Sequence, residues 1–173
     1  MMDPVKRRQA SAARLHAVQA LFQMEAAGVA ADHVLREFET YRFGEVLDGL
    51  ELAEGDVDLF RRIVLEAVNH QARIDQMTDR ALVVRWRIER LDATLRALFR
   101  AAGAELVALD TPPKVIISQY LDVAEAFYPD LHSPDDPDAP PLRNREKAFV
   151  NAVLDHMARE ARPEAFARSR ARN

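Results

Sequence analysis

Apolar residues recur at three- and four-residue steps along most of the chain, which is the spacing of amphipathic helices. Shorter apolar patterns predict helices over about 10–27, 32–41, 56–71 and 73–84, another after Thr111-Pro112-Pro113, and a last one that begins near Arg145. The clearest stripe spans about five turns and predicts a central helix buried among the others. Its members are Leu91, Leu95, Leu98, Phe99, Ala102, Leu106 and Leu109. The pattern therefore predicts an all-α fold with about seven helices.

Helix-ending and helix-starting residues divide the pattern at a few places. Gly28 stands where the first helix should stop. Thr111 is a candidate N-cap, and a proline after it suits the first helical position, where its missing N–H costs nothing. Gly103 lies inside the central helix, which suggests a close approach of another helix there. The segment 43–55 contains three glycines and is expected to be a loop or an irregular turn.

Three segments fall outside the apolar pattern. Residues 1–9 are expected to form a basic N-terminal arm, and residues 129–143 an acidic, Pro-rich loop. Residues 162–173 are rich in arginine and are expected to fray. The rest of the 173 residues shows no internal repeat, so we expect a single domain over 1–173.

Composition narrows the function classes. The chain contains no cysteine, which excludes disulfides and thiolate sites, and it has no apolar run of membrane-spanning length. No signal peptide is recognisable, and we expect a cytoplasmic protein. Phosphate-binding loops, nucleophile elbows and paired metal-ligating histidines are missing. Asp135, Asp136 and Asp138 look like a calcium loop, but Pro137 interrupts them, and a solvated acidic loop fits better. We therefore expect no enzyme, no cofactor and no metal.

Charge is unevenly distributed. Residues 25–60 contain ten carboxylates and two arginines and therefore carry a charge of −8. Because the net charge of the whole chain is −4, the remaining residues together carry +4. Basic residues cluster at the N-terminus, namely Lys6, Arg7, Arg8 and Arg14. A cationic arm joined to a helix can follow a phosphate backbone, and arginine can stack on unpaired bases. Charge alone favours an RNA-binding arm and a terminus that only improves solubility equally.

Four segments together resemble the NusB family of bacterial transcription antitermination factors. They follow the order and spacing of the family across nearly the whole chain, which makes the set more specific than any one motif. The segments are RLHAVQALFQ (14–23), LRALFRAAGAEL (95–106), TPPKVII (111–117) and FVNAVLD (149–155).

This resemblance implies a domain of two packed helical sub-bundles that binds boxA-type single-stranded RNA. It further implies the ribosomal protein NusE as partner and an antitermination complex on RNA polymerase that serves rRNA operons. By position, the implied RNA contacts are Lys6, Arg7, Arg8, Arg14, Lys114 and Lys147. The implied NusE contacts are Phe22 and Glu89, although Phe22 fits the core equally well.

The chain departs from the family pattern where arginines usually precede Arg14, because 10–13 here read Ala-Ser-Ala-Ala. A second hypothesis is therefore a helical interaction adaptor with the same fold but without sequence-specific RNA binding. A third is an RNA-modifying enzyme, for which the chain lacks a cofactor-binding domain. Self-association into a homodimer is left open.

Overall fold

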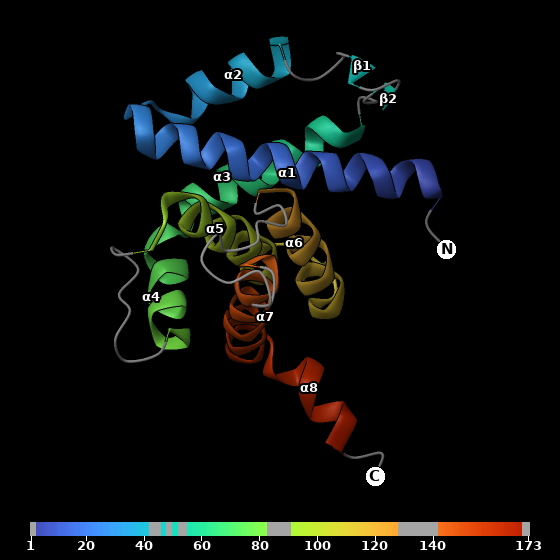
Figure 1. Cartoon of the computed structure of the whole chain (residues 1–173), viewed down its shortest axis with the longest axis vertical. Coiled ribbons are helices and arrows are strands. Elements are labelled where there is room, and N and C mark those ends of the chain that lie inside the picture. Colours follow the sequence, from blue (N-terminus) through green and yellow to red (C-terminus); the bar gives the residue numbers. More distant parts are fainter. Residues whose placement is uncertain are drawn as a thin grey trace.

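The computed structural model describes residues 3–41, 46–47, 50–51, 55–82, 91–127 and 142–170. Within these ranges the chain forms eight α-helices and one two-residue β-pairing (Figure 1). The helices are α1 (Pro4–Ala27), α2 (Ala31–Tyr41), α3 (Gly55–Asn69), α4 (Gln71–Ala81), α5 (Ala93–Ala108), α6 (Pro113–Phe127), α7 (Leu142–Ala161) and α8 (Pro163–Arg170). The strands β1 (Val46–Leu47) and β2 (Leu50–Glu51) pair antiparallel, with Val46 opposite Glu51. The predicted all-α class is confirmed.

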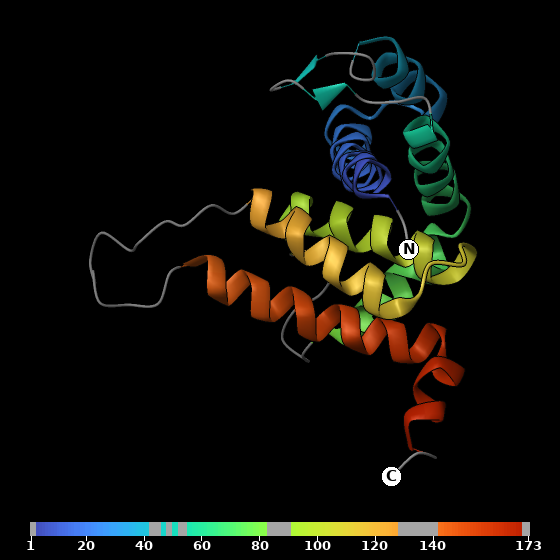
Figure 2. The same cartoon turned by 90° about the vertical axis from the view of Figure 1, so that its right-hand side faces the viewer.

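Helix α5 is the central element. It contacts α1 and α3 on one side and α4, α6 and α7 on the other, while α2 covers α1 and α3. Figure 2 shows α1, α2 and α3 as one group above α5, α6 and α7. The apolar stripe of α5 explains this position, since Leu95, Leu98, Phe99 and Leu106 are all buried. The arrangement agrees with the two sub-bundles that the resemblance implied.

Helix α1 begins two turns earlier than the apolar pattern predicted. The Asp3 carboxylate accepts a hydrogen bond from the Val5 backbone N–H at 3.0 Å, and Pro4 occupies the first helical position. The residues expected to form a basic arm are therefore helical from Pro4 onward, and that expectation was wrong. At the other end Gly28 terminates the helix with φ +65°, a left-handed conformation that glycine adopts without strain.

The arginine-rich tail also differs from expectation, because it folds into α8 instead of fraying up to Arg170. Arg162, between α7 and α8, donates hydrogen bonds to backbone carbonyls at the C-terminal end of α5. Its acceptors are Leu106 at 2.9 Å, Glu105 at 2.7 Å, Leu109, and Thr111 just beyond the helix at 2.5 Å. The Glu105 carbonyl also accepts from the Leu109 backbone N–H at 3.2 Å, and a cation suits the negative end of the helix dipole. Arg162 thus caps α5.

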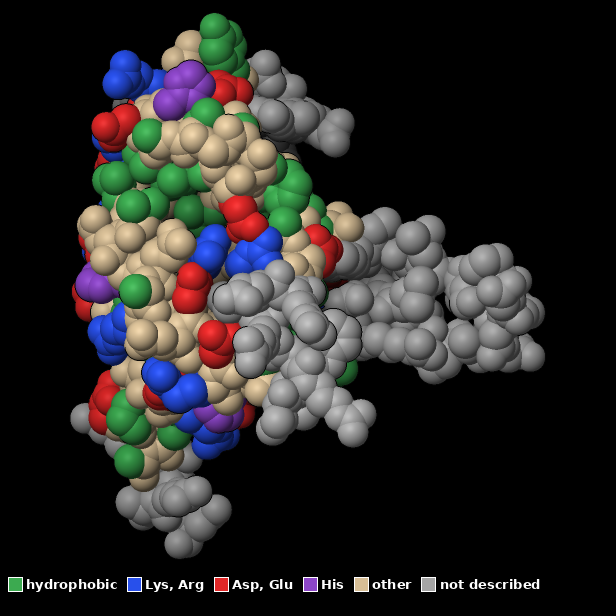
Figure 3. All heavy atoms as spheres, turned by 90° about the vertical axis from the view of Figure 1, so that its left-hand side faces the viewer, with side chains coloured by type: hydrophobic (Ala, Val, Ile, Leu, Met, Phe, Trp, Pro, Cys, Tyr) green, Lys and Arg blue, Asp and Glu red, His purple; other side chains and the backbone are tan. Residues whose placement is uncertain are grey.

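Ion pairs join α1, α4 and α5 at the surface. Glu25 of α1 pairs with Arg96 and Arg100 of α5, and Arg100 also pairs with Asp75 of α4 at 2.9 Å. On the face seen in Figure 3, basic and acidic side chains alternate and do not form a patch of one sign. The charges of these described residues therefore serve contacts between helices.

The start of α6 differs in part from the prediction. The Thr111 hydroxyl donates to the Glu105 carboxylate at 3.2 Å and does not cap α6, so the N-cap assignment was wrong, whereas Pro113 does take the first helical position.

The acidic loop predicted over 129–143 lies outside the described residues, apart from its last two positions in α7. No helix that the structure describes combines the length and apolarity needed to cross a membrane.

Candidate functional site

The first two turns of α1 carry an exposed cationic surface. Lys6, Arg7 and Arg8 are all exposed, and the helix holds them in fixed relation to one another. The Arg8 Nε donates to the Pro4 carbonyl one turn earlier at 3.5 Å. A basic cluster on a rigid helix is better organised for a polyanion than a flexible arm, because less side-chain and backbone freedom is lost on binding.

Arg14 points into the protein. Its side chain is 7% exposed, and it donates from Nε and Nη2 to the two carboxylate oxygens of Glu105 on α5, both at 2.9 Å. Burial alone lowers the pKa of the Arg14 guanidinium, but the hydrogen bonds and the attraction of Glu105 outweigh it and the net pKa is raised. The expectation that Arg14 leads an exposed cationic surface was therefore wrong in its geometry, because a buried carboxylate already neutralises it.

A polar network surrounds this ion pair. Gln119 of α6 accepts from the Ser11 hydroxyl at 2.6 Å and from Arg14 Nη1 at 3.4 Å. Tyr120 is fully buried beside the pair, and burial together with the Glu105 carboxylate raises the pKa of its phenol. The network fixes α1 against α5 and α6, so Arg14 acts here as a positioning residue.

A hollow of about 510 Å³ opens next to this network, and we call it the α1–α6 hollow. It is lined by Arg7, Ala10 and Arg14 of α1, Leu59 of α3, and residues of the segment 111–119. Val115 on its wall is 42% exposed, and Lys114 beside it in the chain is exposed. The structure thus brings Arg7, Arg14 and the Pro-Pro-Lys segment together.

Lys147 stands apart from these groups. Helices α6 and α7 run in opposite directions (Figure 2), and Lys114 and Lys147 lie in the first two turns of their respective helices. They are therefore at opposite ends of the helix pair, and one short RNA contact surface does not include both. Lys147 is also half-buried.

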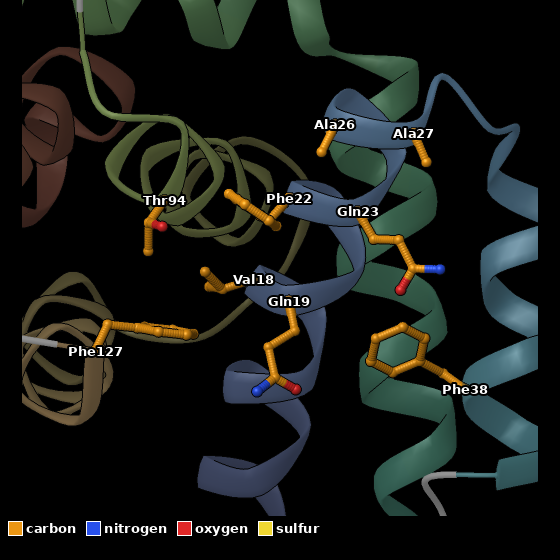
Figure 4. Close-up of a pocket in the computed structure, with 9 residues that line it drawn as sticks. All are labelled: Val18, Gln19, Phe22, Gln23, Ala26, Ala27, Phe38, Thr94 and Phe127. Carbon is orange, nitrogen blue, oxygen red and sulfur yellow. The ribbon is translucent and has the colours of Figure 1, made fainter.

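Phe22 lies at a second hollow, of about 450 Å³, which we call the Phe22 hollow. Figure 4 shows Val18 and Phe22 on the side of α1 that faces Phe127, Gln23 on the side that faces Phe38, and Gln19 between them. Phe22 is 40% exposed, although the core was an equally good expectation from sequence. The buried Gln19 Oε1 has no hydrogen-bond partner among the described residues. An apolar hollow with an unused acceptor is suited to docking a protein segment.

A sequence model described as the NusB family matches residues 11–133. The chain belongs to the NusB family. Among curated relatives, the transcription antitermination protein NusB of Maricaulis maris is 43% identical over 90% of this chain and 89% of its own. The Caulobacter vibrioides protein of the same name is 41% identical over 88% of this chain and 93% of its own.

Solved NusB structures share the fold. NusB of T. maritima superposes with a TM-score of 0.65 at 25% identity, over 96% of this chain and 99% of that one. A structure described as antitermination factors NusB and NusE in complex with dsRNA gives 0.65 at 20% identity, over 88% of this chain and 98% of that one. At 20% identity that likeness concerns the fold alone.

The NusB family match has a bearing on each site residue. It includes Arg14, Phe22 and Lys114, whereas Lys6, Arg7, Arg8 and Lys147 fall outside it. Glu89 is within the match but outside the described residues, so its partner-binding role stays a prediction. The RNA-binding roles also stay predictions, with Arg14 now placed behind the surface instead of on it.

Sequence reasoning missed several residues that shape these surfaces. Glu105 stood as a lone carboxylate within the apolar stripe of α5, and that signal could have identified it as the partner of a buried cation. Gln119 and Phe127 carried no comparable signal, because their importance comes from the packing of α6 against α1. Among the described residues, no group of three or more histidine or carboxylate side chains is placed to hold a metal ion.

Proposed function

We propose that this chain is an RNA-binding transcription antitermination factor that binds boxA-type single-stranded RNA together with NusE. The single observation that carries the proposal is the exposed cationic turn of α1 beside the α1–α6 hollow. The names of the curated relatives support the role in antitermination, and the NusB–NusE complex, whose RNA is double-stranded, supports RNA binding together with NusE. By the same reasoning the factor joins an antitermination complex on RNA polymerase in the cytoplasm and serves rRNA operons.

The mechanism is non-covalent assembly. Arg7, Arg8 and Lys6 neutralise phosphates along the first turns of α1, and Lys114 extends this contact to the start of α6. Each neutralised phosphate releases counterions, so affinity falls steeply as salt rises. Bases that splay out of the strand supply sequence discrimination.

NusE is proposed to dock at the Phe22 hollow. A partner side chain fills the space between Phe22 and Phe127, and a partner N–H donates to the buried Gln19 Oε1. Exposed aromatic anchors of this kind contribute most of the affinity in many protein interfaces. The partner and the RNA then occupy different ends of α1.

A salt titration of RNA binding tests the proposal. The full chain, with and without NusE, is titrated against boxA-like and scrambled RNA of equal length at several salt concentrations. Replacing Lys6, Arg7 and Arg8 with Gln should reduce the slope of log K against log salt by about 2, at about 0.7 per lost contact on a single strand. The matched control replaces Arg36, Arg62 and Arg73, which are also exposed, and should leave the slope unchanged.

A second function, a docking adaptor without sequence-specific RNA binding, is favoured by the inward position of Arg14. Under that reading the Phe22 hollow still binds NusE, but boxA-like and scrambled RNA bind equally. Equal affinity of the two RNAs, with intact NusE binding, would replace the first proposal by the second. Light scattering in the same samples reports whether the chain forms a homodimer.

A further inference from the structure

The α1–α6 hollow has the size and composition of a small-ligand site. Its volume of about 510 Å³ lies within the range of roughly 300–1,000 Å³ found for such sites. Ala10, Leu59, Pro112 and Val115 give it an apolar wall. Arg7 at its edge and Lys114 beside Val115 bring exposed cations to the hollow, whereas the charge of Arg14 at its base is balanced by Glu105. An occupant should therefore be flat or apolar in part and attached to negative charge.

Gln119 supplies a polar group of defined orientation. Arginine only donates hydrogen bonds, so the amide atom near Arg14 Nη1 must be the Gln119 oxygen. The Ser11 hydroxyl donates to the same oxygen. The Gln119 NH₂ group is thereby turned away from both, and it has no acceptor among the described residues. Gln119 also lines the hollow, so it offers a donor to an occupant that carries a carbonyl.

We infer that the α1–α6 hollow binds one unstacked base of a single-stranded RNA, and that this base accepts a hydrogen bond from the Gln119 amide. This inference rests on the proposed RNA-binding function and adds a base-binding site to it. Each base offers an acceptor for this donor, a carbonyl oxygen in uracil, cytosine and guanine and a ring nitrogen in adenine. The base packs on Pro112 and Val115, and the flanking phosphates contact Arg7 and Lys114.

The charges around the hollow set the side on which the strand lies. Asp58 and Asp110 are exposed and adjoin Leu59 and Thr111 in the chain. Phosphates should therefore avoid the α3 side and follow α1 and the start of α6. This path places a base over the hollow as the strand crosses from Arg7 to Lys114.

The test measures binding of 12-nucleotide oligouridylate to the full chain. Val115→Ser should weaken this binding by a factor of about 3–10, because apolar surface buried between the base and Val115 is lost. The matched control is Val68→Ser on α3, since Val68 is 40% exposed and Val115 is 42%. Ala10→Phe should also weaken binding by filling the hollow, with Ala72→Phe on α4 as its control.

Gln119→Leu tests the hydrogen bond to the base. It should weaken oligouridylate binding by a factor of about 2–10 relative to the unmodified protein, because one hydrogen bond is lost. Thermal unfolding of each variant establishes whether it is folded. If Gln119→Leu does not fold, Val115→Ser still tests the base site, because Val115 is exposed and its replacement should not disturb the core.

Each contrary outcome is distinguishable. Salt-dependent RNA binding that Val115→Ser and Ala10→Phe leave unchanged would overturn the base site but keep the proposed function. An unchanged oligouridylate affinity in folded Gln119→Leu would overturn the Gln119 contact to the base. If Ala10→Phe altered the solution mass instead of RNA affinity, the hollow would be an interface between copies of this chain. Absence of RNA binding by the unmodified protein at low salt would overturn both.

Discussion

Arg14 and Glu105 are 91 residues apart in the chain, yet each satisfies the other inside the core. Glu105 is fully buried and accepts from Arg14 and from the Thr111 hydroxyl, so its charge is compensated by a guanidinium fork and a further hydrogen bond. A buried pair of this kind contributes little over apolar residues of equal size, but it is costly to break. Its role is to fix the register of α1 on α5.

Replacing Arg14 with Ala should destabilise the fold by about 3–5 kcal/mol, because the Glu105 carboxylate is left buried without its partner. Urea unfolding measures this loss. The control is Arg80→Ala, which breaks the exposed Arg80–Glu160 pair and should cost less than about 1 kcal/mol. Similar small losses for both variants would show that Arg14 is not held as described.

The inward orientation of the Arg14 side chain could have been predicted from the sequence. Arg14, Val18 and Leu21 lie at i, i+4 and i+7, on the stripe of α1 that is buried. The family motif drew attention to Arg14 as a cation and not as a member of this stripe. Its partner could not be predicted from α1 alone, since it depends on how α1 and α5 cross.

At the scale of elements, helices followed from periodicity wherever an apolar face existed. The stripe of α5 predicted 91–109, and the helix spans Ala93–Ala108 with Leu91 and Leu109 buried at its ends. The first two turns of α1 have no such face, because 6–8 are all basic. They are helical because of Asp3 and Pro4, a start signal that hydrophobic spacing does not contain.

Gly103 lies at a close approach between α4 and α5, as its position in the central helix suggested. A Cβ added there would lie 2.3 Å from Cγ2 of Ile74. We expect Gly103→Ala to destabilise the protein by about 1–3 kcal/mol, since overpacking exceeds the gain in helix propensity. Chemical denaturation of the single and double variants measures this. Ile74→Ala should relieve the clash, so the double variant should lose less stability than the sum of the losses in the two single variants. Strictly additive losses would contradict the contact.

The ion pairs between α1 and α5 predict a dependence of stability on pH. The hydrogen bond from Arg96 is the largest cause that lowers the pKa of Glu25 below its ordinary value of 4.5, with Arg100 adding to it. A carboxylate with a lowered folded-state pKa stabilises the fold above the unfolded-state pKa and loses this contribution as the pH falls through the folded value.

Glu25→Gln should therefore reduce stability near neutral pH and flatten its decline below about pH 4.5. The loss at neutral pH should be about 0.5–1 kcal/mol, as expected for a partly exposed pair. Denaturation midpoints from pH 3 to pH 7 would reveal it, with Glu164→Gln, an exposed residue of α8, as control. Parallel curves for the variant and the unmodified protein would exclude the pair as a source of acid sensitivity.

For the whole molecule, the two proposed binding surfaces share one helix. Arg7 and Phe22 are fifteen positions apart on α1, which is about 22 Å along the helix axis. The all-α class and the family followed from sequence, because periodicity and four spaced motifs are properties of the chain. The two hollows did not, because each is formed by residues from three or more elements.

This separation predicts that the two activities can be removed independently. Phe22→Ser should weaken NusE binding at least tenfold while RNA affinity changes less than twofold, since aromatic anchors commonly contribute about 2 kcal/mol or more. Replacing Arg7 and Arg8 with Gln should have the reverse effect. Calorimetry with each ligand in turn measures both. A Phe22 variant that lost RNA binding to the same extent would indicate one continuous surface.

The hydrogen bonds from Arg162 to the C-terminal end of α5 have a consequence for folding during translation. The carbonyl of Glu105 accepts from the Leu109 N–H and also from Arg162, a side chain 57 residues further along the chain. During translation the upstream helices can begin to assemble first, but the last turn of α5 lacks the hydrogen bonds from Arg162 until that residue has left the ribosome. We expect nascent chains that end before this arginine to hold α1–α6 loosely, and the finished fold to tighten only when α7 has docked.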